Sequence, residues 1–289
     1  MLMSDEIPKT ELCNMKIDGP IARITLDRVD SHNALNIQLI SELISLLEWS
    51  SDRSVGKIGE LRDEEVSQYL RVLLINSEGK HFCAGADINM MKEGGSKSPE
   101  ENRLDAERLD GLFHGIWSHP CFTIGCIQGV ALGGGAGLVA CMDHSIGEPR
   151  TQIALSEAKL GISAAVIGPY VYRRLGSAQF RRLAMMASRI GSDEALRIGF
   201  IDQIADSKES MAKCSESVIS EVLTSGPMAV ASAKKMVGFL DEWGGDNAAL
   251  RIWTLDLTSE MRGSPEGQEG LSSFIEGRSP SWFPEEQDG

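Results

Sequence analysis

Two glycine-rich segments and one glutamate are the residues whose types and order could do chemistry. Residues 82–88 read FCAGADI, residues 129–135 read GVALGGG, and Glu157 lies in the segment SEAKLG at residues 156–161. Glycine lets the backbone approach a ligand closely, so N–H groups from both turns could meet one oxygen atom. A carboxylate beside them could move a proton. Together these groups could stabilise an enolate next to a carbonyl group.

The expected donors are the backbone N–H groups of Ala86 and Gly134. An α,β-unsaturated or α-protonated carbonyl compound becomes an enolate when a nucleophile adds at C3 or a proton leaves C2, and each fixed donor stabilises that charge by roughly 3 kcal/mol. Gly134 is also expected to begin a helix, where the dipole favours negative charge. Close packing of a turn against a helix would equally explain an isolated glycine triplet. A nucleotide phosphate loop is disfavoured, because Leu138 stands where G-x-G-x-x-G requires glycine.

Glu157 lies between two apolar stretches, at residues 153–155 and 160–162. Burial there would raise the pKa of its carboxyl group and suit it to proton transfer near neutral pH. A glutamate that starts a helix is otherwise usually a cap or a surface residue. Its position after the two glycine turns favours a general acid and base.

These motifs together resemble the crotonase superfamily, which includes the enoyl-CoA hydratases and isomerases. NALN at residues 33–36 and the segment at residues 194–201 also fit the family pattern, and the similarity extends over residues 15–278. The resemblance implies an α/β fold, a spiral of ββα units followed by a C-terminal helical trimerisation region. It implies an acyl-CoA thioester as substrate, and a homo-trimer or hexamer.

The resemblance also implies roles for individual residues. Ala86 and Gly134 would form the oxyanion hole, and Glu157 would be the catalytic glutamate. Coenzyme A would enter as part of the substrate and would not be bound permanently. Six residues are expected to contact it, the first four through their backbone and the last two from a segment that closes over it: Ala34, Ala84, Asp87, Ile88, Phe274 and Arg278.

Position 137 departs from the pattern of the two-carboxylate hydratases. These enzymes carry a second glutamate in a G-G-G-x-E pattern, where this chain has Gly137. The segment at residues 155–161 is similar to that of Δ3,Δ2-enoyl-CoA isomerases, in which one glutamate moves a proton between C2 and C4. Residues 134–140 and 165–171 instead resemble a bacterial hydratase branch assigned to 3-methylglutaconyl-CoA-type substrates. Gly137 would then line the substrate pocket and leave room for a 3-branched acyl group.

The interpretation favoured by these motifs is an acyl-CoA hydratase that adds water to a 2-enoyl-CoA with Glu157 as its single carboxylate. A Δ3,Δ2-enoyl-CoA isomerase that uses Glu157 alone is the alternative. A catalytically inactive CoA-binding homologue is a third hypothesis. For hydration, the sequence names no group that would help to position the water.

The composition is that of a globular protein, with 42% hydrophobic and 24% charged residues. A net charge of −14 argues against non-specific binding to nucleic acids or anionic membranes, yet allows a local basic pocket for a phosphorylated ligand. The six cysteines form no C-x-x-C pair and the five histidines show no ligand spacing, so no metal site is expected. Without a window long enough to span a membrane, a cytoplasmic location is expected.

Apolar periodicity divides the chain into an α/β core at residues 1–205 and a helical region at 206–289. The family resemblance implies that the core holds the CoA-binding and catalytic site, and that the helical region serves oligomerisation and closes over CoA. The N-terminal pattern predicts a β-hairpin at residues 13–26, a helix at 37–49 and a buried strand at 71–76. Residues 51–67 are predicted to be an exposed insertion and residues 93–103 a mobile loop before a helix at 105–117. The helices expected in the C-terminal region lie at residues 208–224, 228–240, 247–261 and 265–276.

Overall fold

The strands of this computed structural model, which describes residues 6–62 and 68–283, form two sheets. The larger sheet contains, in spatial order, β1 (Cys13–Asp18), β2 (Ile21–Leu26), β3 (Val72–Ser77), β4 (Phe122–Ile127), β6 (His144–Gly147) and β9 (Gln203–Ile204). Its neighbouring strands are parallel except for β1, which pairs antiparallel with β2 as the predicted hairpin. The smaller sheet contains β5 (Val130–Leu132), β7 (Gln152–Ala154) and β8 (Ile190–Gly191).

Successive turns of the chain place one strand in each sheet and then a helix. β4 is followed by β5 and by α5 (Gly134–Ala140). β6 is followed by β7, by the short 3-10 helix η2 (Glu157–Leu160) and by α6 (Gly168–Met186). This repetition confirms the predicted spiral of ββα units, and it brings the starts of α5 and η2 to the ends of neighbouring strands in the smaller sheet.

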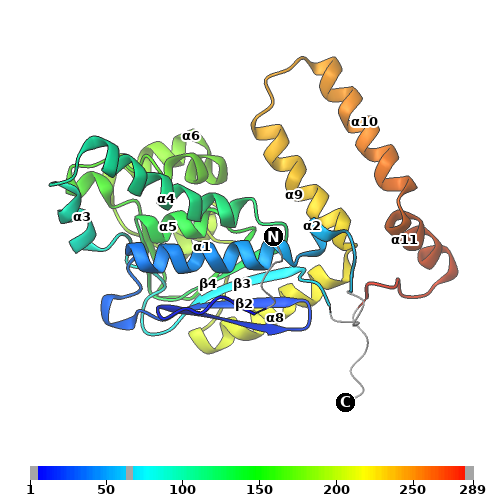
Figure 1. The fold of residues 1–289 in the computed structure, drawn as a ribbon, viewed down its shortest axis with the longest axis horizontal. Coiled ribbons are helices and arrows are strands. Elements are labelled where there is room, and N and C mark those ends of the chain that lie inside the picture. The colour runs from blue at the N-terminus through cyan, green and yellow to red at the C-terminus, as the bar shows by residue number, and fades with distance from the viewer. Residues whose placement is uncertain (1–5, 63–67, 284–289) are drawn as a thin grey trace.

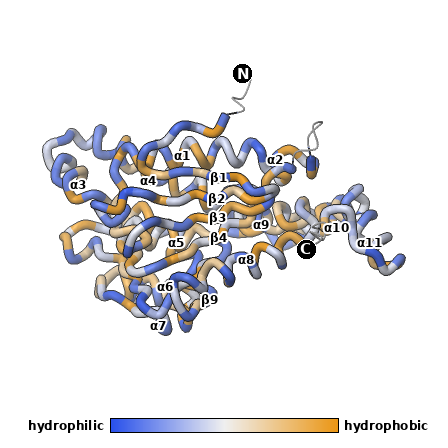
Figure 2. Tube along the Cα trace, turned by 90° about the horizontal axis from the view of Figure 1, so that it is seen from below, coloured by the Kyte–Doolittle hydropathy of each residue, from blue (hydrophilic) through white to orange (hydrophobic). Residues whose placement is uncertain are grey.

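Both faces of the larger sheet are covered by helices (Figure 1). On one face, α1 (Ile37–Asp52), α4 (Pro99–Trp117) and α5 contribute to the main hydrophobic core. On the other face, α8 (Lys208–Thr224) packs Met211, Ile219 and Leu223 against the strands. Burial on both faces explains why β3 and β4 read as short continuous apolar runs (Figure 2).

Residues 93–103 form less of a loop than predicted. Helix α3 (Ile88–Gly94) extends into this segment, and α4 already begins at Pro99. The reason is a capping box, in which the Ser98 side chain accepts from the Glu101 amide while the Glu101 side chain accepts from the Ser98 amide. The sequence S-P-E-E therefore starts the helix before any apolar residue appears.

Residues 51–67 also contain more structure than an exposed insertion. Helix α1 continues to Asp52, and a short helix, α2 (Val55–Ile58), buries Val55 and Gly56 against α9 (Pro227–Asp241). Residues 63–67 of the predicted insertion lie outside the described residues.

The four predicted C-terminal helices are all present. Helices α8 and α9 are followed by α10 (Asn247–Gly263) and α11 (Pro265–Glu276), and these last two stand away from the strand-bearing body (Figure 1). The strands of the described chain end at β9, close to the predicted boundary at residue 205. Packing does not break there, because α8 completes the second core cluster. None of the helices within residues 6–62 and 68–283 is both long and apolar enough to cross a membrane.

Candidate active site

A cleft of about 450 Å³ opens where the two glycine-rich turns meet η2. The spiral brings these three segments together although they are far apart in the sequence. Seven of the ten predicted site residues line this cleft: Ala34, Ala84, Ala86, Asp87, Ile88, Gly134 and Glu157.

The backbones of the two turns pack so closely against each other that side chains at Gly85 and Gly135 would not fit. Gly85 has a φ of +98°, and a Cβ atom there would lie 2.7 Å from the carbonyl oxygen of Leu132. A Cβ atom at Gly135 would lie 2.3 Å from the carbonyl oxygen of Cys83. Close packing is therefore one real reason for these glycines. The same contact sets Gly134 beside Ala86, whose amide nitrogen is 3.9 Å from the Cβ position of Gly134.

The N–H groups of Ala86 and Gly134 have no acceptor among the described residues. Two other amides of the first turn are paired, since the amide of Ala84 donates to the carbonyl of His32 and the amide of Asp87 donates to the carbonyl of Leu35. Gly134 is buried and Ala86 half-buried. Backbone donors that lose water on folding are nearly always paired, so two unpaired ones on the same cleft indicate a site for an external acceptor. An oxygen atom in the cleft could accept from both.

Glu157 presents an unpaired carboxylate to the same cleft. Its Oε2 is buried and has no hydrogen-bond partner in the described part of the chain, and its Oε1 lies 3.1 Å from the Cβ position of Gly133. Burial raises the pKa of Glu157, and only a hydrogen bond to its own backbone opposes this shift. The carboxylate therefore lines the same cleft as the two unpaired amides, and its raised pKa brings it nearer to the range in which a group can exchange protons.

Ser156 is a polar residue of the cleft that the sequence did not single out. Its Oγ lies 3.4 Å from the Cβ position of Gly133, the same point that Glu157 Oε1 approaches. No hydrogen bond joins this hydroxyl to another described residue. In the sequence, only its position directly before Glu157 could have pointed to Ser156, and that position alone does not indicate a functional role.

The predicted CoA contacts at the edge of the cleft would use carbonyl oxygens. The N–H groups of Ala34, Ala84 and Asp87 are already hydrogen-bonded within the protein. The Asp87 side chain caps α3 and forms an ion pair with Arg28, at 2.6 Å between Oδ2 and NH1. Burial alone would raise the pKa of Asp87, but hydrogen bonds from Arg28 and Asn89 lower it overall, so the carboxylate remains charged and fixed.

The role of Gly137 in making room for a branched acyl group stays a prediction, and the structure shows core side chains beside this glycine. Gly137 is absent from the described lining of the cleft. A Cβ atom there would lie 2.5 Å from Cγ2 of Ile167 and 3.0 Å from two ring carbons of Phe113. The space next to Gly137 is thus filled by core side chains, and a second glutamate could enter only by displacing them.

Phe274 and Arg278 do not reach the cleft within one chain. Figures 1 and 2 place α11, which carries Phe274, at the opposite end of the molecule from α3 at the cleft. Phe274 is 86% exposed, and Arg278 forms ion pairs with Glu269 and Glu276. Their predicted contacts with coenzyme A would need a second copy of the chain.

Known proteins share this fold and are similar to this sequence over most of its length. The "short-chain-enoyl-CoA hydratase" of Clostridium acetobutylicum is 26% identical over 276 residues, which is 92% of this chain and 95% of the relative. An "enoyl-CoA isomerase/hydratase" of Mycosarcoma maydis is 27% identical over 266 residues, covering 90% and 91% of the two chains. A crystal structure of an enoyl-CoA hydratase from Shewanella pealeana superposes with a TM-score of 0.85 at 34% identity, covering 95% of this chain and 97% of that one.

The family comparison agrees with the geometry. A model of the enoyl-CoA hydratase/isomerase family matches residues 16–285, nearly the whole chain. This span contains both glycine turns, the two unpaired amides and the buried carboxylate. With the crotonase-type spiral and this match, the chain belongs to the enoyl-CoA hydratase/isomerase family.

Proposed function

We propose that this protein is an acyl-CoA hydratase, which adds water across the double bond of a 2-enoyl-CoA. One observation carries the proposal: two unpaired backbone donors, on Ala86 and Gly134, share a cleft with the unpaired carboxylate of Glu157. The addition of water to an unsaturated thioester requires hydrogen-bond donors for the carbonyl oxygen and a base for the water, and both line this cleft.

In this mechanism the thioester oxygen accepts hydrogen bonds from the N–H groups of Ala86 and Gly134. Glu157 removes a proton from a water molecule while the water oxygen bonds to C3. The electron pair of the double bond then moves toward the carbonyl group to form the enolate. The protonated Glu157 then returns the proton to C2, so that one water is added in total. Its raised pKa suits both steps, because the carboxyl group must accept and release a proton in one turnover.

The hydroxyl of Ser156 is proposed to hold the attacking water together with Glu157. The hydroxyl oxygen of Ser156 and Oε1 of Glu157 both approach the Cβ position of Gly133, and the hydroxyl has no hydrogen-bond partner among the described residues. A hydroxyl can both donate to and accept from water. In this proposal Ser156 is a positioning residue that takes over the task of a second glutamate, for which the packing around Gly137 leaves no room.

The lining of the cleft favours an uncharged acyl group. Leu160, Ile162 and Met91 supply apolar surface, and no lysine or arginine belongs to the lining that the structure describes. A free carboxylate on the acyl chain, as in 3-methylglutaconyl-CoA, would lack a fixed cationic partner here. A short or medium uncharged 2-enoyl chain is therefore the proposed substrate.

A Δ3,Δ2-enoyl-CoA isomerase is the second candidate, because the cleft presents a single carboxylate. Moving a proton between C2 and C4 needs one base and the oxyanion hole, and no bound water. A catalytically inactive CoA-binding protein is the third.

Product analysis in deuterated water separates the three functions. The protein would be incubated separately with crotonyl-CoA, a 3-enoyl-CoA and 3-methylglutaconyl-CoA, and the masses of the products would be measured by mass spectrometry. Addition of one water to crotonyl-CoA, lost in Glu157→Gln by about 10²-fold or more, is expected. Double-bond migration without added water would establish the isomerase. Binding without any turnover would establish the inactive homologue.

A further inference from the structure

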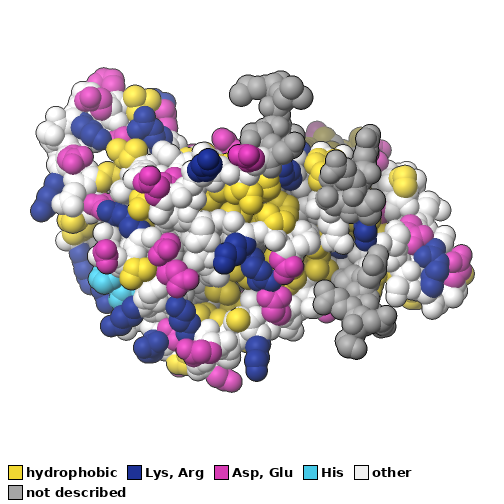
Figure 3. All heavy atoms as spheres, turned by 60° about the horizontal axis from the view of Figure 1, so that its bottom comes forward, with side chains coloured by type: hydrophobic (Ala, Val, Ile, Leu, Met, Phe, Trp, Pro, Cys, Tyr) yellow, Lys and Arg dark blue, Asp and Glu magenta, His cyan; other side chains and the backbone are white. Residues whose placement is uncertain are grey.

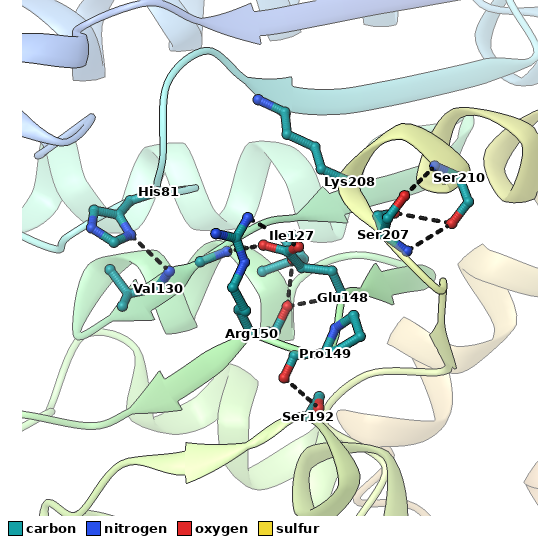
Figure 4. A network of polar contacts seen from close by, with 12 residues as sticks. His81, Ile127, Val130, Glu148, Pro149, Arg150, Ser192, Ser207, Lys208 and Ser210 are labelled. Carbon is teal, nitrogen blue, oxygen red and sulfur yellow. Dashed lines mark hydrogen bonds and ion pairs between the residues drawn. The ribbon is translucent and has the colours of Figure 1, made fainter.

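One side-chain hydrogen bond joins the two segments that carry the unpaired amides. Nδ1 of His81 accepts the amide proton of Val130 at 3.3 Å, which assigns the ring proton to Nε2 (Figure 4). His81 lies five residues before Ala86, and Val130 lies four residues before Gly134. The imidazole therefore connects the first glycine-rich segment to the second.

This imidazole takes the place of a backbone carbonyl. The two segments pair in parallel at Cys83, whose amide donates to the carbonyl of Val130 at 3.1 Å. In a regular parallel ladder the Val130 amide would donate to the carbonyl of His81, two residues before Cys83. That carbonyl instead accepts from the side-chain amide of Asn33 at 2.9 Å. The His81 side chain thus supplies the acceptor that its own backbone does not.

The preceding amide of the second segment is also held by a side chain. The Gly129 amide donates to Oε1 of Glu148 at 3.0 Å, and this carboxylate is buried. A Cβ atom at Gly129 would lie 2.5 Å from Nδ1 of His81, so the ring lies directly against this turn. The second segment therefore begins between a buried carboxylate and a half-buried imidazole.

The imidazole can exchange protons with the solvent. His81 is half-buried and lines a cavity of about 510 Å³, and Figure 3 shows histidine side chains beside those of Lys and Arg at one edge of the surface in view. Glu148 is the acidic group next to this turn, and its Oε2 faces Arg150 at 3.5 Å. Burial lowers the pKa of His81, and so do the neighbouring positive charges of His32, Lys80, Arg189 and Arg150. The ring therefore stays neutral to a lower pH than an ordinary histidine.

We propose that His81 is a positioning residue for the oxyanion hole, whose neutral Nδ1 holds the segment of Gly134 in place against the segment of Ala86. A protonated ring has no acceptor at Nδ1, so the Val130 amide would lose its partner and the second segment would shift. The ladder bond at Cys83 remains, so the shift is small and the chain stays folded. The inference rests on the proposed function, because it concerns the same two amides.

Two substitutions separate the acceptor from the ring. His81→Asn retains an acceptor that does not titrate, because the side-chain carbonyl of asparagine can take the position of Nδ1. His81→Phe retains a ring of similar size without an acceptor. His114→Asn is the matched control, at an exposed position of α4 that belongs to the described lining of neither the cleft nor the cavity.

Hydration of crotonyl-CoA and exchange of the C2 protons of a saturated acyl-CoA would be measured as a function of pH. At neutral pH, His81→Phe should lower kcat of both reactions about tenfold and change KM less than about threefold, because a displaced donor weakens transition-state binding most. His81→Asn should retain the wild-type kcat. As the pH falls, the ratio of kcat of His81→Asn to that of the wild type should rise, since only the wild type loses the acceptor. His114→Asn should match the wild type at every pH.

Amide resonances give a readout that does not depend on turnover. In protein labelled with 15N-valine and 15N-glycine, the Val130 and Gly134 amides of the wild type should shift with pH at one common midpoint. Neither amide of His81→Asn should shift at that midpoint. These comparisons with His81→Asn remain decisive if His81→Phe does not fold.

A Val130 amide that follows the pH while Gly134 does not would overturn the proposal, because the bond would then be local. Equal losses of kcat in His81→Asn and His81→Phe would also overturn it, because the ring would then only fill space. A wild type whose two amides both follow His81, yet which adds no water to crotonyl-CoA, would reject the hydratase and retain the positioning role.

Discussion

At the scale of single residues, the site is defined by polar groups that the protein leaves unpaired. The amides of Ala86 and Gly134, the buried oxygen of Glu157 and the hydroxyl of Ser156 all face one cleft without partners among the described residues. Folding usually satisfies such groups, because an unpaired buried polar atom costs about 1–3 kcal/mol. Their concentration in one place is the physical signature of a site that awaits a ligand.

The unpaired carboxylate should make stability depend on pH. Burial raises the pKa of Glu157 above its ordinary value of 4.5, so the folded chain holds this proton more tightly than the unfolded chain. Its contribution to stability is therefore greatest below that ordinary value and is lost as the pH rises through the raised pKa. Glu157→Gln should be more stable than the wild type at pH 8 and about equally stable at pH 4, as measured by urea denaturation.

Glu48→Gln, at an exposed position of α1 that forms no ion pair with another described residue, is the control for that measurement. It should change the unfolding free energy equally at both pH values. A wild type and a Glu157→Gln variant of equal stability at pH 8 would contradict the assignment of Glu157 as a buried, ionising base.

Ser156→Ala should separate hydration from proton transfer. Losing one hydrogen bond to the water should lower kcat for hydration about tenfold. Exchange of the C2 protons of a saturated acyl-CoA with deuterated water should persist, because it needs only Glu157 and the two amides. Ser156→Thr retains the hydroxyl and should restore hydration. Equal losses in both reactions would show that Ser156 merely supports the shape of the cleft.

At the scale of elements, two segments that read as loops are held in place by specific contacts. The capping box at Ser98 starts α4 earlier than its apolar residues indicate. Helix α2 places Gly56 where its Cβ atom would lie 2.7 Å from Cβ of Ala231, and the Gly56 carbonyl accepts from Lys235 at 3.3 Å. The insertion therefore anchors α9 to the sheet-bearing core.

Substitutions at two glycines should change the unfolding free energy in opposite directions. Gly56→Val should lower the unfolding free energy by about 1–3 kcal/mol, because Ala231 and Pro120 leave no space for the side chain. Gly111→Ala, in the exposed face of α4 with its nearest neighbour at 3.8 Å, should raise it by about 0.5–1 kcal/mol. Denaturation by urea checks both. Tolerance of valine at position 56 would show that α2 does not fix α9.

At the scale of the whole molecule, the C-terminal helices form a surface without a partner in one chain. Helix α10 buries none of its residues, and Ile252 and Leu255 are 60% and 59% exposed. Phe274 and Ile275 on α11 are more than 80% exposed. Exposed apolar surface of this kind is typical of protein interfaces, and we propose that these helices contact a second copy of the chain.

Leu255→Glu should therefore dissociate the protein. The wild type is expected to be a trimer or hexamer by light scattering on a sizing column, and the variant a monomer, because a charge would be buried at the interface. Leu104→Glu, at an apolar position of α4 that is 54% exposed, serves as the control and should keep the wild-type mass. A monomeric wild type would contradict the proposed assembly.

The sequence by itself determined the hairpin, helix α1 and the C-terminal helices, because apolar periodicity is a local property of the chain. The ββα spiral was implied only by the resemblance to the family, whose motifs occur in the same order. It also named Ala86, Gly134 and Glu157, which the structure brings to one cleft. Their chemical roles stay predictions.

Only the tertiary structure decided which neighbours each residue has. It filled the space at Gly137 with Phe113 and Ile167, set Ser156 beside Glu157, and gathered Lys80 and Arg189 around one cavity. It also placed α11, which carries Phe274, at the opposite end of the molecule from α3 at the cleft. The physical reason is that packing joins residues far apart in the sequence, so the room beside a glycine or the sum of charges in a cavity depends on side chains that no local pattern contains.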